Sequence, residues 1–128
     1  MTEAAKQFMK SWCSVVNRRD LDGLMALYDE EAILIPTFSN QLLNAPEKIR
    51  KYFQKLCDRE ELSIALHANT VAAQIVGPDL HSVCGIYCWR FAVDGEVLSF
   101  EARFSFLVDL KRPRPILQHH SSQIPRSL

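Results

Sequence analysis

The first part of the chain carries apolar residues at helical spacing. Positions three or four apart share one face of an α-helix, so a stripe of apolar residues at that spacing marks a helix that packs on a core. The first stripe comprises Ala5, Phe8, Met9, Trp12, Val15 and Val16. It predicts an amphipathic helix that ends at about Asn17. Asp20 can then cap a shorter second helix. The buried side of that helix would comprise Leu21, Leu24, Met25 and Tyr28.

A short strand and a third helix follow. The apolar run AILIP, residues 32–36, predicts a strand that its proline terminates. Asn44 precedes Ala-Pro-Glu, which is typical of a helix start with proline in the first turn and Glu47 three residues after the cap. The buried stripe of this helix would comprise Ile49, Tyr52, Phe53 and Leu56. Three helices therefore come first.

The second half of the chain changes to strands. Four long runs rich in β-branched and aromatic residues cover residues 63–76, 80–93, 96–111 and 116–124. Turn-forming residues separate them, and the strongest hairpin signal is Asp94-Gly95. Helices followed by an antiparallel meander predict an α+β fold. The length of 128 residues fits a single domain over residues 1–128.

The hairpin turn predicts the register of its two strands. With Asp94 and Gly95 as the loop, the pairs are Val93 with Glu96, Arg90 with Ser99, Cys88 with Glu101, and Ile86 with Arg103. One face then carries Tyr87, Trp89, Phe91, Leu98, Phe100, Phe104 and Phe106. The other face carries Cys88, Arg90, Ser99, Glu101, Arg103 and Ser105.

Two interpretations of these faces are open. In the first, the aromatic face packs on the helices and the polar face meets water. In the second, the polar face lines a cavity and the aromatic face meets another subunit, because large exposed aromatic patches mark interfaces. The last strand adds the sequence Gln118-His119-His120-Ser121-Ser122. Side chains alternate along a strand, so His119 and Ser121 share one face and at most one histidine looks into the protein.

Composition and charge narrow the partners. Fifteen basic and fifteen acidic residues give a formal net charge of zero, so neither nucleic acid nor an anionic membrane is expected as a partner. The N-terminal segment has no apolar secretory core, which predicts a cytoplasmic protein with reduced thiols. The pair Cys84 and Cys88 has no second ligand pair nearby, so we expect buried thiols and no metal. With four glycines and no phosphate-binding loop, no cofactor is expected.

The order of elements resembles the nuclear transport factor 2-like, or cystatin-like, cone fold, which also includes ketosteroid isomerase and the SnoaL-like polyketide cyclases. The segments LDGLMALYDEEAILIPTFSN, APEKIRKYF, EARFSFLVDL and ILQHHSSQIP resemble proteins similar to the association domain of calcium/calmodulin-dependent protein kinase II. This resemblance covers nearly the whole chain. It implies a cone-shaped, curved antiparallel sheet wrapped around three N-terminal helices, with a pocket inside and a homodimer formed through the outer face.

The resemblance also implies roles for single residues. It favours the second interpretation of the hairpin, in which the polar face lines the pocket. The implied pocket comprises Trp12, Tyr28, Cys88, Glu101, Arg103, Ser105, His119 and Ser121. The implied subunit interface comprises Tyr87, Trp89, Phe91, Phe104, Phe106 and His120.

Two functions follow as expectations. The first is a self-associating domain without kinase activity that binds a small, anionic ligand near Arg103. The alternative is a small SnoaL-like enzyme of isomerase, dehydratase or cyclase type, with His119 as acid/base. The chain has Pro36 and Ser105 where ketosteroid isomerase has its carboxylates, which disfavours that enzyme's mechanism. A contact from Glu101 to His119 would favour the enzyme, whereas neutralisation of Arg103 by Glu101 would favour the binding domain.

Overall fold

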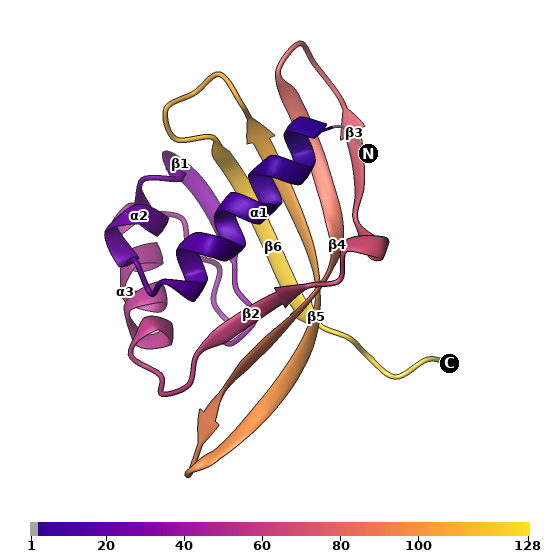
Figure 1. Cartoon of the computed structure of the whole chain (residues 1–128). Coiled ribbons are helices and arrows are strands. Elements are labelled where there is room, and N and C mark those ends of the chain that lie inside the picture. The colour runs from indigo at the N-terminus through magenta and orange to yellow at the C-terminus, as the bar shows by residue number, and fades with distance from the viewer. Residues whose placement is uncertain (1–2) are drawn as a thin grey trace.

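Three helices accompany a curved sheet in the computed structural model, which describes residues 3–128 (Figure 1). The helices are α1 (Glu3–Asn17), α2 (Leu21–Met25) and α3 (Pro46–Cys57). Asp20 caps α2 as predicted, because its carboxylate accepts a hydrogen bond of 2.9 Å from the Gly23 amide. The predicted cap of α3 is wrong by one residue. The cap is Ala45, and the Asn44 side chain instead accepts a bond from Lys48.

The strands are β1 (Tyr28–Ile35), β2 (Ser63–Leu66), β3 (Ala72–Ile75), β4 (Leu80–Val93), β5 (Glu96–Asp109) and β6 (Ile116–Gln123). Tyr28 is buried as predicted, but it begins β1 instead of closing α2. The predicted strand over residues 63–76 is broken by the 3-10 turn η1 (Ala68–Thr70). The Thr70 hydroxyl stabilises this turn by donating to the His67 carbonyl and accepting from the Ile86 amide.

The sheet has the strand order β1-β6-β5-β4-β2, and β3 pairs with the remaining length of β4. The pairing of β1 with β6 is parallel, so the sheet is mixed and departs from the predicted antiparallel sheet at this one pairing. The other pairings are antiparallel. The α+β class and the cone fold are confirmed. In Figure 1, β4 and β5 run as one long bent ribbon behind α1, and their turn projects beyond the other strands.

The register of the β4–β5 hairpin is confirmed at all four predicted pairs, from Val93 with Glu96 outward. Asp94 and Gly95 form the turn with φ angles of 52° and 83°. Positive φ at both central positions is what a tight two-residue hairpin loop requires, and aspartate and glycine tolerate it.

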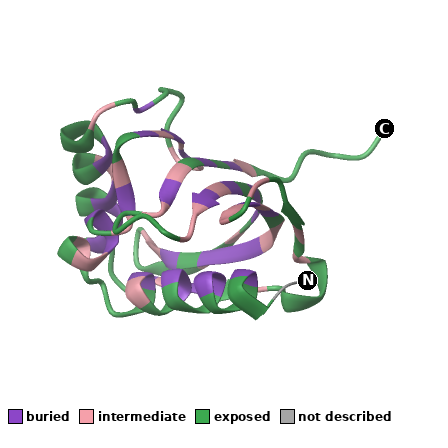
Figure 2. Cartoon of the chain, turned by 90° about the horizontal axis from the view of Figure 1, so that it is seen from above, coloured by how far each residue is buried: buried purple, intermediate pink, exposed green. Residues whose placement is uncertain are grey.

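The aromatic face of the hairpin points inward, toward α1. Tyr87, Trp89 and Phe106 are almost completely buried and lie against Trp12 at ring-centroid distances between 5.3 and 5.9 Å. The predicted subunit interface of Tyr87, Trp89, Phe91, Phe104 and Phe106 is therefore wrong, because these side chains form the core of the chain itself. Figure 2 shows buried residues lining the inner side of α1 and of the sheet.

The polar face is the convex outer face. Ser105 pairs with His120 and Arg103 pairs with Ser122, whereas Phe106 pairs with His119 and Phe104 with Ser121. Residues directly opposite each other in an antiparallel pair share a face. Arg103 and Ser105 thus lie on the face opposite to His119, and the prediction that they share one pocket with it is wrong. His120 lies on the outer face, as predicted.

None of the helices described between residues 3 and 128 has the length and apolar character needed to cross a membrane. Within the same range, no group of three or more histidine, cysteine or acidic side chains is placed to hold a metal ion.

Candidate functional site

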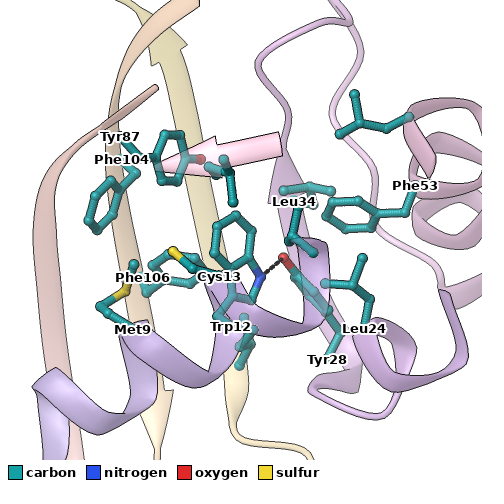
Figure 3. Close-up of a cluster of buried hydrophobic side chains, with 14 of the residues drawn as sticks. Met9, Trp12, Cys13, Leu24, Tyr28, Leu34, Phe53, Tyr87, Phe104 and Phe106 are labelled. Atoms are coloured by element: carbon teal, nitrogen blue, oxygen red, sulfur yellow. Dashed lines mark hydrogen bonds between the residues drawn. The ribbon is translucent and has the colours of Figure 1, made fainter. Parts of the chain in front are cut away.

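Four side chains from separate elements form a hydrogen-bonded chain at the centre of the molecule. The Trp12 indole N–H lies 3.3 Å from the Tyr28 hydroxyl, which lies 2.8 Å from His119 Nδ1. The Tyr87 hydroxyl lies 3.0 Å from His119 Nε2. Figure 3 shows Trp12 and Tyr28 pointing toward each other across the core. The resemblance implies that Trp12, Tyr28 and His119 lie together in a pocket. The structure brings these three side chains together, but it buries them in the core.

The hydrogen-bond partners favour one tautomer of His119. Indole can only donate, so the Tyr28 oxygen accepts from Trp12 and its own hydrogen is free for His119 Nδ1. Nδ1 is then the acceptor, and the ring hydrogen on Nε2 is donated to the Tyr87 hydroxyl. The opposite tautomer would make the Tyr28 oxygen accept twice, and its own hydrogen would be left over. With Nε2 protonated, Tyr28 and both ring nitrogens of neutral His119 are satisfied, and the Tyr87 hydroxyl is left to donate to the Ser121 or Thr37 hydroxyl.

The surroundings of His119 disfavour its charged form. Its ring stacks on Phe106 at a centroid distance of 3.8 Å. Burial, and secondarily the charge of His120, lower the pKa of His119 from 6.5 to about 3. Burial likewise raises the pKa of Tyr28 and of Tyr87 well above the usual value for tyrosine. His119, Tyr28 and Tyr87 therefore stay neutral at physiological pH, and their hydrogen bonds stabilise the core.

The remaining predicted pocket residues are divided between the two faces. Ser121 lies on the inner face, where its hydroxyl bonds that of Thr37. Glu101, Arg103 and Ser105 are exposed on the outer face. Glu101 reaches neither His119 nor Arg103. Its carboxylate lies 2.9 Å from His67 Nε2, so neither contact that would separate the two expected functions is formed.

Cys88 also belongs to the outer face by register, although it is nearly buried. Its sulfur lies 3.6 Å from the Trp89 carbonyl oxygen. All four cysteines are free thiols, and Cys13 is buried enough to raise its pKa to about 11. Burial of this kind makes the Cys13 thiol unreactive. The prediction of buried thiols for Cys84 and Cys88 is confirmed for Cys88 and wrong for Cys84, which is exposed.

A cavity of about 630 Å³ opens at the mouth of the cone. It lies between α3, the loop that follows β1, and the ends of β4 and β5 next to their turn. Its apolar wall comprises Phe38, Leu43, Tyr52, Leu56, Phe91, Val93 and Phe100. Two backbone contacts frame it: the Leu34 and Leu43 bridge closes the loop, and the Ala92 amide donates to the Glu60 carbonyl. A volume of this size suits a small organic molecule.

The phenylalanines of the cavity form a compact aromatic group. Phe38 meets the edges of Phe91 and Phe100 at centroid distances of 5.2 and 5.3 Å, and these two rings stack at 4.9 Å. Tyr52 supports the loop because its hydroxyl accepts a hydrogen bond of 3.2 Å from the Phe38 amide. Burial raises the pKa of Tyr52 to about 12, so it remains a neutral donor and acceptor.

Sequence reasoning missed this cavity. Phe38 lies in a loop outside any periodic pattern. The sequence places Phe91 and Phe100 on the aromatic face of the hairpin, but it gives no sign that Phe38 packs against them. The available signal was the spacing of Lys48, Lys51 and Lys55, which places three charges along one side of the third helix.

The fold is that of a cone-shaped α+β domain with a cavity at its mouth. The chain belongs to the nuclear transport factor 2 (NTF2) domain family, whose model matches residues 4–109. No curated protein matches the chain in sequence.

Solved structures agree with this assignment. A candidate calcium/calmodulin-dependent protein kinase II association domain from Xanthomonas campestris is 21% identical, with a TM-score of 0.85 over 97% of this chain and 88% of that chain. The association domain of this kinase from C. elegans is 17% identical, with a TM-score of 0.74 over 94% of this chain and 93% of that one. A candidate dehydratase of the NTF2-like family from Streptomyces avermitilis is 12% identical, with a TM-score of 0.77 over 92% of each chain. These similarities establish the fold, and the neighbours that share it are described as association domains and as a candidate dehydratase.

Proposed function

We propose that this chain is a self-associating, ligand-binding domain that takes a small molecule with an apolar body into the cavity at the mouth of its cone. The observation that carries the proposal is the aromatic wall of a cavity of about 630 Å³. Such a wall is costly to leave in water, and an apolar ligand would cover it. The cone interior deeper than the mouth is filled by the core around His119, so the ligand would bind at the mouth only.

Binding without catalysis fits the chemistry of the cavity. General acid/base catalysis needs a group whose pKa lies near the working pH. Among the described residues around the cavity there is no histidine, cysteine, aspartate or glutamate. His119, the acid/base group of the alternative enzyme, lies in the core with both ring nitrogens bonded to tyrosines. These features support a binding domain over an enzyme that relies on His119.

Filling the cavity should abolish binding. Val93 is half-buried on the cavity wall, so Val93→Trp should occupy the space with little effect on the core. We expect affinity for naphthalene probes, 2-naphthalenemethanol and 2-naphthoate, to fall by at least about tenfold in calorimetric titrations, which corresponds to about 1.4 kcal/mol. Val97→Trp is the matched control, because Val97 lies on the same hairpin, is 40% exposed and does not line the cavity. Equal binding by both variants, or none by the unaltered protein, would refute the proposal.

Self-association would use the convex face of the sheet. This face mixes half-buried Ile86 and Leu107 with exposed polar and charged groups, including Glu101 and Arg103. A mixture of apolar and polar surface is typical of interfaces between separately folded subunits. Two structural neighbours are described as association domains, which supports a second copy as the occupant.

A charge at the middle of this face should weaken association. Ser105 is exposed, between Cys84 and His120 on the neighbouring strands. We expect the unaltered protein to sediment at twice the 14.7 kDa mass of one chain or above. Ser105→Asp should shift it toward a single chain, because two like charges would be buried near each other at a twofold interface. Sedimentation of the unaltered protein as a single chain at all concentrations would contradict self-association.

A further inference from the structure

We infer that the ligand of the mouth cavity is an aromatic carboxylate, a class that rests on the proposed function and narrows it. Every charged side chain around the cavity is positive: Lys48, Lys51, Lys55 and Arg59. The whole chain has equal numbers of basic and acidic residues, so four cations and no anion around one cavity is a local separation of charge. A cavity whose charged residues are all positive favours a ligand that carries an anionic group.

The three lysines form one row on α3. Their spacing of three and four residues puts them on a single side of the helix, and Arg59 follows just after its end. Within residues 3–128, no ion pair involves any of these four side chains, and Lys48 has only the amide oxygen of Asn44 at 3.3 Å. Arg50, on another side of the same helix, is instead paired with Asp22 at 2.6 Å. The cations at the cavity are thus available to a ligand.

Arg59 joins the cationic row to the aromatic wall. Its guanidinium lies 5.2 Å from the centroid of the Phe91 ring, within the range of a cation–π contact. That contact holds a planar group with several N–H donors beside the phenylalanine rings. A carboxylate matches such a donor fork, and lysines at the same edge add charge without strict geometry.

The orientation of the phenylalanine rings in the cavity wall favours a ligand with a flat aromatic ring system. Phe38 presents its ring at steep angles of 83° and 78° to Phe91 and Phe100, which are themselves stacked. Flat rings fit such walls through stacking and edge contacts. A free phosphate or a sugar phosphate would leave this surface uncovered. An aromatic ring system with one carboxylate satisfies both the wall and the charged edge.

Two matched probes test whether the ligand is an aromatic carboxylate. Calorimetric titration with 2-naphthoate and with its neutral analogue 2-naphthalenemethanol isolates the effect of the carboxylate on the same ring system. We expect 2-naphthoate to bind about tenfold more tightly at low salt and to lose most of this advantage at high salt, because exposed cations are screened. Inorganic phosphate is titrated alongside as an anion without an apolar body, and we expect no binding.

Matched variants assign the effect to the row on α3. Lys51→Gln/Lys55→Gln should weaken 2-naphthoate by about fivefold to tenfold and leave 2-naphthalenemethanol unchanged. Lys6→Gln/Lys10→Gln removes the same charge from exposed positions on α1 and should change neither affinity.

The outcomes separate the two proposals. Equal affinities for the two probes would overturn the carboxylate class and leave a cavity for neutral ligands. A carboxylate preference that both double variants reduce alike would overturn the role of the row on α3, because the preference would then follow the net charge of the protein. Tighter binding of phosphate than of 2-naphthoate would overturn it in favour of a phosphorylated ligand. Binding of neither naphthalene probe would overturn both the class and the proposed function.

Discussion

Replacement of Phe104 with aspartate should prevent folding, whereas aspartate at the next residue, Ser105, should not. Phe104 is 4% exposed and stacks on Tyr87 at a centroid distance of 4.6 Å. Loss of a buried phenylalanine costs about 3–5 kcal/mol, and an unpaired carboxylate in its place costs several more. The sum is comparable to the entire stability of a domain, about 5–15 kcal/mol. Circular dichroism and thermal melting of the Phe104→Asp and Ser105→Asp variants measure the difference.

This pair of variants also tests which face of the sheet is inside. The two residues are neighbours on β5 with opposite orientations, so they receive the same charge at nearly the same place. A folded Phe104→Asp variant that merely fails to associate would show that the aromatic face is a subunit interface after all. A folded Ser105→Asp variant with altered sedimentation is compatible with both the core and the convex interface described above.

Acidification should destabilise the protein through His119. Its folded-state pKa of about 3 lies below its ordinary value of 6.5, so the unfolded chain binds a proton that the folded chain rejects. Between these two values, the free energy of unfolding should fall by roughly 1.4 kcal/mol for each unit that the pH decreases. Above this window the histidine is neutral in both states and contributes no slope. Urea titrations across the window measure the effect.

The variant His119→Gln isolates this contribution from that of the carboxylates. It should be less stable at neutral pH, because its amide cannot satisfy both Tyr28 and Tyr87 in the same geometry. Its unfolding free energy should nevertheless depend less steeply on pH in this window. His120→Gln, at an exposed neighbouring position, should keep nearly the full slope. Identical slopes for the unaltered protein and His119→Gln would mean that His119 becomes protonated in the folded protein.

These properties divide the inner face of the sheet into two regions. Around His119, aromatic rings and the hydrogen bonds of Trp12, Tyr28 and Tyr87 fill the space between α1 and the middle of the strands. Near the β4–β5 turn, the strands extend past α1 (Figure 1). There α3, the residues just after it and the loop after β1 line the cavity together with the strands. The cavity exists because the strands are longer than the helical layer that covers them.

Much of this fold could be predicted because its signals are local. The helical stripe ending at Asn17, the Asp20 cap and the Asp94-Gly95 turn each depend on residues close together in the chain. The turn alone sets the β4–β5 register, because in a two-residue loop each pair follows by counting. Errors came where distant contacts overrode local preference. The predicted strand begins at Ala32, whereas β1 begins at Tyr28 and includes the polar residues Glu30 and Glu31. These residues are part of the strand because Tyr28 and Ile33, on either side of them, both pair with β6.

The sequence by itself determined that the β4–β5 hairpin has an aromatic and a polar face, and that His119 and His120 point to opposite sides. It could not determine which hairpin face accompanies His119, because that depends on how β6 pairs with β5. The tertiary structure decided this through the pairing of Phe106 with His119. The cavity likewise depends on α3, the loop at Phe38 and the hairpin meeting in space, and hydrophobic burial is non-directional, so no local pattern specifies such a meeting.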